Sequence, residues 1–155
     1  MRREIPIHQP RDAAYAERVR TSFALQPAMA LIGAELAVVE PGYTEIHLPY
    51  RDAITQQHGF IHGGVVGMIA DSAAGYAANT LTAADVSVLT VEYKLNLLAP
   101  ADGERLVARG EVVKPGRTLL ITKAEVFAVK DGQWTLCALM QQTIMAMHGK
   151  SERGG

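Results

Sequence analysis

One carboxylate stands alone in a long apolar stretch of this chain of 155 residues. Between Val65 and Leu81 nearly every residue is apolar or small, and Asp71 carries the only charge. This pattern predicts a helix that is buried on nearly every side. A buried carboxylate without partners is unfavourable, so it is normally kept for chemistry or satisfied by a neighbouring amide or serine. Asp71 is therefore the first candidate for a functional side chain.

Two glycines, Gly63 and Gly64, come immediately before that stretch. They have no side chains to block an approaching ligand, and the first N–H groups of a helix lack acceptors within it. With the help of the helix dipole, such donors can bind a developing negative charge, which is the task of an oxyanion hole. Close packing of the helix against a sheet is the other reason for glycines at this point.

The spacing of these candidates has a consequence for assembly. Asp71 lies eight positions after Gly63, and a rise of about 1.5 Å per residue separates them by roughly 12 Å along one helix. A carboxylate cannot attack a carbonyl that is held so far away. If both groups act on one substrate, Asp71 must come from a second copy of the chain, which a two-fold dimer would supply.

Length and composition narrow the classes of function. The length fits one domain, and no linker-like segment divides it. The formal net charge of −1 offers no basic field for nucleic acid, so we expect no nucleic-acid partner. The single cysteine, Cys137, lies between apolar residues and excludes an internal disulfide. This favours a core thiol in a reducing compartment.

The two ends of the chain and its central helix bear on location and organisation. The N-terminus lacks the apolar run and cleavage site of a secretory signal, so we expect a cytoplasmic protein. Asp71 and Asn79 make membrane insertion of the central helix unfavourable, and we expect no membrane association. Residues 1–30 are expected to form a helical segment packed on the domain, residues 31–148 the single domain, and residues 149–155 a flexible tail.

Hydrophobic periodicity predicts the elements that position these residues. Asp12–Ser22 is interpreted as a covering helix with one apolar stripe. Beyond the central helix the period changes to two, as in strands, and short turn signals predict that the last four strands form an antiparallel meander. The predicted strands are Ala34–Glu40, Thr44–Pro49, Val86–Ala99, Glu104–Lys114, Thr118–Lys130 and Trp134–Met147. The expected fold class is α+β, a long central helix wrapped by a curved antiparallel β-sheet.

These motifs resemble the hot-dog-fold acyl-CoA thioesterases, in particular those of the phenylacetic-acid-degradation (PaaI-like) type. The resemblance extends from about Ile32 to Met147. It rests on His58-Gly59-Phe60-Ile61-His62-Gly63-Gly64, on Asp71, and on Thr90-Val91-Glu92-Tyr93-Lys94-Leu95-Asn96-Leu97-Leu98-Ala99-Pro100. The combined motif is more specific than a glycine pair alone.

The resemblance implies a thioester hydrolase. By this resemblance, the Gly63 amide of the present chain would polarise the thioester carbonyl. Asp71 of the facing subunit would act as nucleophile or as general base for water. Gln56 would orient the attacking water or the thioester, and Thr90 would assist that step. The pairing of Gln56 with Asp71 mixes the patterns of two branches of the family, so the substrate subgroup stays open.

The two histidines of the motif have supporting interpretations. His62 is expected to cap the helix or hold the loop, and direct catalysis is the less favoured alternative. His58 and Gly64 are placed among the substrate-binding residues with Thr90. His58 and His62 are spaced like a metal-binding pair, but the glycines make a continuous helix through both unfavourable, and no third ligand is nearby. We expect no metal and no cofactor.

Three functions remain open at this point. The first is hydrolysis of an aromatic or medium-chain acyl-CoA by a homodimer or by a dimer of dimers. The second is a non-catalytic acyl-CoA-binding hot-dog module, which would not need Asp71. The third is a hot-dog hydratase, which would require a histidine a few positions after the aspartate, and Asp71 is followed by none.

Overall fold

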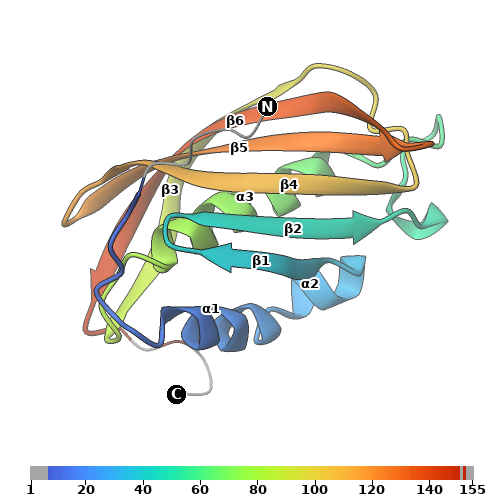
Figure 1. Ribbon diagram of the computed structural model, residues 1–155. Coiled ribbons are helices and arrows are strands. Elements are labelled where there is room, and N and C mark those ends of the chain that lie inside the picture. The colour runs from blue at the N-terminus through green and yellow to red at the C-terminus, as the bar shows by residue number, and fades with distance from the viewer. Residues whose placement is uncertain (1–6, 151, 153–155) are drawn as a thin grey trace.

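The computed structural model describes residues 7–150 and residue 152 (Figure 1). The expectations for residues 1–6, and for residues 151 and 153–155 of the predicted tail, lie outside the described residues. The helices and strands that were predicted begin and end within a few residues of their expected ranges. In chain order they are α1 (Tyr15–Ala24), α2 (Pro27–Ile32), β1 (Glu35–Glu40), β2 (Tyr43–Pro49), the 3-10 turn η1 (Asp52–Ile54), α3 (Gly63–Asn79), β3 (Val86–Leu97), β4 (Arg105–Pro115), β5 (Leu119–Lys130) and β6 (Gln133–His148).

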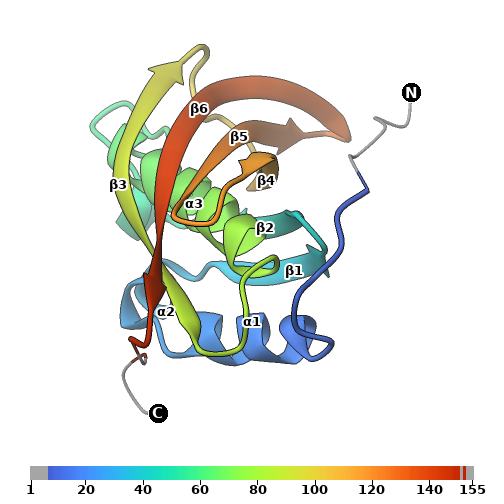
Figure 2. The same ribbon diagram turned by 90° about the vertical axis from the view of Figure 1, so that its left-hand side faces the viewer.

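Helix α3 forms the centre of the fold. Across the described residues, the strands join in one antiparallel sheet in the order β1-β2-β4-β5-β6-β3. The sheet curves around α3, as Figure 2 shows. The helix contacts β2, β4, β5, β6 and β3, and its alanines are buried against them. This arrangement confirms the predicted α+β architecture, a central helix wrapped by a curved antiparallel sheet.

Small residues allow α3 to lie unusually close to the sheet. A Cβ atom on Gly110 of β4 would lie 2.2 Å from the backbone carbonyl of Ala73, so any larger residue would push the helix away. On the neighbouring strand, the Thr44 hydroxyl donates a hydrogen bond to the same Ala73 carbonyl at 2.7 Å. Ala70, Ala73, Ala74 and Ala77 are fully buried. The contact between helix and sheet therefore depends on glycine and alanine at the crossing point.

The predicted meander is correct for β4, β5 and β6 but wrong for β3. Strand β3 pairs with β6 at the far edge of the sheet, while β4 pairs with β2 and β5. The Asp102-Gly103 segment is therefore a crossover and not a hairpin turn. Helix α3 separates β2 from β3 in the chain, and its packing across the sheet carries β3 to the opposite edge. Turn residues alone cannot reveal such a long-range pairing.

The expectation that α3 is buried on nearly every side is wrong for one chain. The sheet covers one side of the helix, while a stripe along the other side is only partly covered. The stripe consists of Gly64, Val65, Met68, Asp71, Ser72 and Gly75. These residues recur at intervals of three or four, so they lie on one face of the helix. Asp71 is accordingly half-buried in a single chain rather than enclosed.

A β-bulge in β3 changes which residues face the helix. The pairing with β6 shifts register between Thr90 and Glu92, which leaves Val91 as the extra residue. Before the bulge, Thr90 faces α3 and bonds Asp71. After the bulge, Leu95 and Leu97 face α3, because they approach Gly67 and Gly63. Simple alternation would have put Thr90 opposite to Leu95 and Leu97, on the polar face of the strand.

The N-terminal helices lie beneath the sheet edge and the end of α3 (Figure 1). Arg18 of α1 donates to the Asn79 side chain at 2.7 Å and to the Thr82 carbonyl at 3.0 Å. Helix α2 was not predicted, because six residues are too few for a periodic pattern. Pro27 begins it, and Gly33, with a φ of 81°, ends it. No helix among the described residues combines the length and hydrophobicity needed to cross a membrane.

Candidate functional site

The N-terminus of α3 presents one free backbone donor. His62 is the N-cap residue, and its Nδ1 atom accepts a hydrogen bond from the Gly64 N–H at 2.8 Å. The Val65 and Val66 amides bond the His62 carbonyl. Within the described part of the chain, the Gly63 N–H has no acceptor. The predicted capping role of His62 therefore matches its geometry, and Gly63, rather than Gly64, retains the N–H that could bind an oxyanion.

Gln56 shares a cavity with this free donor. The cavity has a volume of about 410 Å³ and is lined by Gln56, Gly63 and an apolar wall that includes Phe60, Leu97 and Cys137. The Gln56 Oε1 atom accepts a hydrogen bond from the backbone N–H of His58. Because the amide oxygen is engaged, the Gln56 NH₂ group is the part that can donate to a ligand. The two residues that carry these donors, one in the backbone and one in a side chain, thus line the same cavity.

Asp71 lines a second cavity and belongs to the half-covered stripe of α3 described above. This cavity has a volume of about 310 Å³, and its lining includes Asp71, Ser72, Tyr76 and Thr90. The Thr90 hydroxyl donates to Asp71 Oδ1 at 2.7 Å. The Tyr76 hydroxyl is held by Gln26 at 2.8 Å, and burial raises the pKa of Tyr76. The structure therefore brings Thr90 and Asp71 together as the sequence motif suggests.

One residue of this site, Gln142 of β6, was not identified from the sequence. Its side chain is 1% exposed, and its amide nitrogen donates to Asp71 Oδ1 and, at 3.1 Å, to the Thr90 hydroxyl. Its amide oxygen accepts from the Thr122 hydroxyl at 2.9 Å. The available signal was the position of Gln142 between Met140 and Ile144, in the apolar phase of a strand. A polar residue in that phase must find buried partners.

The donor cavity and the carboxylate cavity are separate in one chain. Gly63 and Gln56 line the first, and Asp71 and Thr90 line the second. Gly63 and Asp71 lie at the start and near the middle of the same straight helix, about 12 Å apart along its axis. A single chain therefore does not present both groups to one small substrate.

The remaining candidates have simpler environments. His58 is exposed in the loop before α3 and does not line the donor cavity. Cys137 is buried, and burial raises the pKa of its thiol to about 11, so the thiol is protonated at neutral pH. Nowhere in the described residues do three or more histidine, cysteine, aspartate or glutamate side chains gather as metal ligands.

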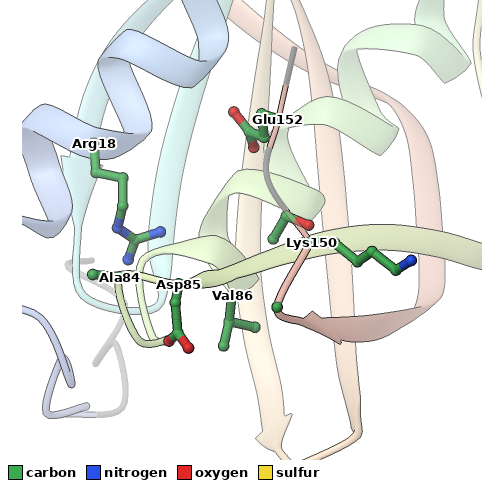
Figure 3. A pocket seen from close by; sticks show the side chains of 8 residues that line it. Arg18, Ala84, Asp85, Val86, Lys150 and Glu152 are labelled. Atoms are coloured by element: carbon green, nitrogen blue, oxygen red, sulfur yellow. The ribbon is translucent and has the colours of Figure 1, made fainter. Parts of the chain in front are cut away.

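A further cleft lies between α1, the start of β3 and the C-terminal segment (Figure 3). Arg18 points into it, but its guanidinium is already bonded to Asp12, Asn79 and Thr82. Asp85 and Lys150 point away from Arg18 in this view. The charged groups of this cleft thus do not converge on one point, and we place no chemistry there.

Comparison with known proteins relates this geometry to a family. The family model of the thioesterase superfamily matches residues 58–135. A protein of Saccharolobus solfataricus, classed provisionally as an esterase, is 32% identical over 107 residues, which are 69% of each chain. A 1,4-dihydroxy-2-naphthoyl-CoA hydrolase of Listeria monocytogenes is 27% identical over 95 residues, covering 61% of this chain and 77% of that protein.

A solved structure extends the likeness to almost the whole fold. The crystal structure of a thioesterase family protein from Silicibacter pomeroyi is 51% identical in sequence, with a TM-score of 0.86. The similarity covers 87% of this chain and 99% of that one. The central helix and the six-stranded sheet of the described residues indicate the same family as the sequence match. The chain therefore belongs to the thioesterase superfamily, has the hot-dog fold and is a thioester hydrolase.

Proposed function

We propose that this protein hydrolyses acyl-CoA thioesters in a site shared between two subunits. The observation that carries the proposal is that the candidate donors and the candidate carboxylate lie in different cavities. Gly63 and Gln56 line one cavity, and Asp71 lines the other. CoA as the thiol carrier is supported by the relative from Listeria monocytogenes, whose name describes a CoA thioester hydrolase. The resemblance of the His58–Gly64 motif supports the phenylacetic-acid-degradation type.

A second copy of the chain would bring the two halves together. Within the described residues, β3 pairs only with β6, so its outer edge is open. A long open edge strand normally has a covering element. Leu89, Val91, Tyr93, Leu97 and Leu98, in β3 and just after it, are 50–57% exposed, and the half-covered stripe of α3 lies beside them. A two-fold dimer through this surface would cover both and set Asp71 of one subunit near Gly63 of the other. Pairing of two such dimers remains part of the proposal.

The chemistry follows from the two halves. The N–H of Gly63 and the NH₂ of Gln56 would donate to the thioester oxygen as negative charge develops on it. Asp71 of the partner would either attack the carbonyl carbon, forming an acyl-enzyme anhydride that water then hydrolyses, or take a proton from the attacking water. In both routes the carbon–sulfur bond breaks and the CoA thiolate leaves. The hydroxyl of Thr90 would hold Asp71 during the reaction.

The acyl group would be aromatic or of medium chain length. Phe60, Val66 and Leu97 give the donor cavity an apolar wall, and a cavity of about 410 Å³ is in the size range of small-molecule sites. A non-catalytic acyl-CoA-binding module is the alternative function. The geometry favours the enzyme, because a binding module has no need for a carboxylate held by two hydrogen bonds beside an accessible cavity.

A hydrolysis screen would test the proposed substrate class. Purified protein would be incubated with aryl-CoA thioesters and with straight-chain acyl-CoA thioesters of increasing length, and release of free CoA would be followed with a thiol reagent. We expect turnover of aryl or medium-chain substrates, and slower turnover of acetyl-CoA because it fills little of the apolar cavity. Tight binding without release of CoA from any of them would support the non-catalytic alternative.

Gln56 offers a test of the donor cavity. Gln56→Ala should lower kcat more than it raises KM, because the lost hydrogen bond strengthens as charge develops in the transition state. We expect a decrease in kcat on the order of 10-fold, which corresponds to the net contribution of one neutral hydrogen bond. Gln56→Asn should recover part of it, because it keeps the amide on a side chain one methylene shorter. The neighbouring exposed Gln57 provides the control substitution Gln57→Ala. Unchanged kcat in Gln56→Ala would remove Gln56 from the site.

A further inference from the structure

Gln142 occupies a position where an apolar side chain would be expected. It lies in the buried phase of β6, between Met140 and Ile144, and is 1% exposed. Its partner across the ladder in β5 is Thr122, which is fully buried in the apolar phase of its own strand. Two buried polar side chains must find hydrogen-bond partners inside the sheet. The pair lies next to Asp71, and Gln142 donates to its carboxylate.

Thr122 determines the orientation of the Gln142 amide. Its hydroxyl donates to Gln142 Oε1 at 2.9 Å, so the amide oxygen points away from Asp71. The NH₂ group then points toward Asp71 Oδ1 and toward the Thr90 hydroxyl, which it reaches at 3.1 Å. The opposite orientation would put the amide oxygen against a carboxylate oxygen, which is repulsive. The chain Thr122, Gln142, Thr90 and Asp71 is thus consistent in donor and acceptor at every link.

The network engages one oxygen of the carboxylate and leaves the other free. Asp71 Oδ1 accepts hydrogen bonds from both Thr90 and Gln142. Asp71 Oδ2 has no donor among the described residues, and Asp71 lines the cavity of about 310 Å³. Two donors on one oxygen fix the plane of the carboxylate, because rotation about its bond would break both hydrogen bonds.

We propose that Gln142, oriented by Thr122, is a positioning residue that holds Asp71 so that Oδ2 is the oxygen acting on the thioester or on water. This inference rests on the proposed function of Asp71 and extends it to a residue that does not touch the substrate. It also gives Thr90 and Gln142 a shared task, since each supplies one donor to Oδ1. Hydrogen bonds to charged groups are the stronger kind, so the loss of one should affect the rate measurably.

The test compares Gln142→Met with Gln141→Met on the same strand. Methionine is close to glutamine in length and is suited to an apolar site, but it cannot donate to Asp71. We expect kcat to fall by about 10-fold to 100-fold, with KM changed by less than about three-fold because the residue does not contact substrate. Gln141 is exposed on the outer face of β6, so its variant should retain wild-type kcat. Melting temperatures of both variants would be measured alongside.

A double-variant cycle separates positioning from general structural support. If Gln142 acts through Asp71, Gln142→Met should have no further effect on kcat in an Asp71→Asn background. A decrease of equal size in both backgrounds would overturn the inference and indicate structural support. Nearly wild-type kcat in Gln142→Met together with loss of activity in Asp71→Asn would also overturn it, while leaving the proposed function intact. Wild-type turnover in Asp71→Asn itself would instead overturn the proposed function.

Thr122→Val keeps the test decisive if Gln142→Met does not fold. Valine preserves the volume of threonine and leaves Gln142 in place, but removes the hydroxyl that orients its amide. We expect a smaller decrease in kcat, a few-fold, because Asp71 and Thr90 still hold the NH₂ group. This decrease should also vanish in the Asp71→Asn background, and persistence there would contradict the inference.

Discussion

The Asp71→Asn variant should lose at least about 100-fold in kcat for its best acyl-CoA substrate. Asparagine keeps the shape of the side chain, and its amide oxygen can still accept the hydrogen bonds from Thr90 and Gln142 that Asp71 Oδ1 accepts. The group that would face the substrate becomes an NH₂, which is neither a nucleophile nor a base. The fold and the assembly should therefore survive while the chemistry does not.

The measurement is steady-state release of CoA, with the melting temperature and the molar mass in solution recorded for each protein. Asp85→Asn is the matched control, because Asp85 is an exposed aspartate in the loop between α3 and β3, and it should retain wild-type kcat. If Asp71→Asn turned over its substrate within a few-fold of wild type, Asp71 would be a structural carboxylate and the proposed mechanism would be wrong.

The second large effect is restoration of activity when two inactive chains are mixed. One chain carries Asp71→Asn, and the other carries Gly63→Pro, which removes the N–H that would bind the oxyanion. Proline is well tolerated at the first position of a helix, and His62 already has the extended backbone, with ψ of 136°, that a residue before proline requires. Each homodimer should be nearly inactive, for a different reason.

In a hybrid dimer, one site would contain an intact Gly63 from one chain and an intact Asp71 from the other. Random pairing of equal amounts makes half of the dimers hybrid with one working site of two, so about a quarter of wild-type activity should return. The chains would be mixed by co-expression or by refolding together. An active wild-type monomer, or no recovery in hybrids that are shown to form, would contradict a shared site.

Gly63→Ala separates loss of the N–H from loss of space. A Cβ atom at this position would lie 2.8 Å from Leu97 Cδ1, the end of a flexible side chain, and both alanine and proline add that atom. Only proline removes the N–H. We therefore expect Gly63→Ala to retain clearly more activity than Gly63→Pro, whereas equal losses would attribute the effect to crowding against Leu97.

Much of the local structure could be predicted from the sequence because it depends on near neighbours in the chain. Apolar content and small residues predicted α3, and periods of two predicted the strands within a few residues. The separation of Gly63 from Asp71, roughly 12 Å, follows from helix geometry alone. Capping was one of the two roles expected of His62, and the structure shows that cap. Helix α2 was not predicted, because a helix of six residues is too short to show a hydrophobic period.

The sequence by itself thus determined the elements of this protein and the pair of candidate groups along α3. Only the tertiary structure decided which strands are neighbours, since pairing of β3 with β6 joins residues about fifty positions apart in the chain. It also decided that a bulge at Val91 turns Thr90 toward Asp71, and that Gln142 and Thr122 meet beneath that carboxylate. The physical reason is the distance along the chain over which each effect acts. Propensity and periodicity depend on residues a few positions apart, whereas strand order and buried hydrogen-bond networks depend on packing and hydrogen bonds between distant segments in the core.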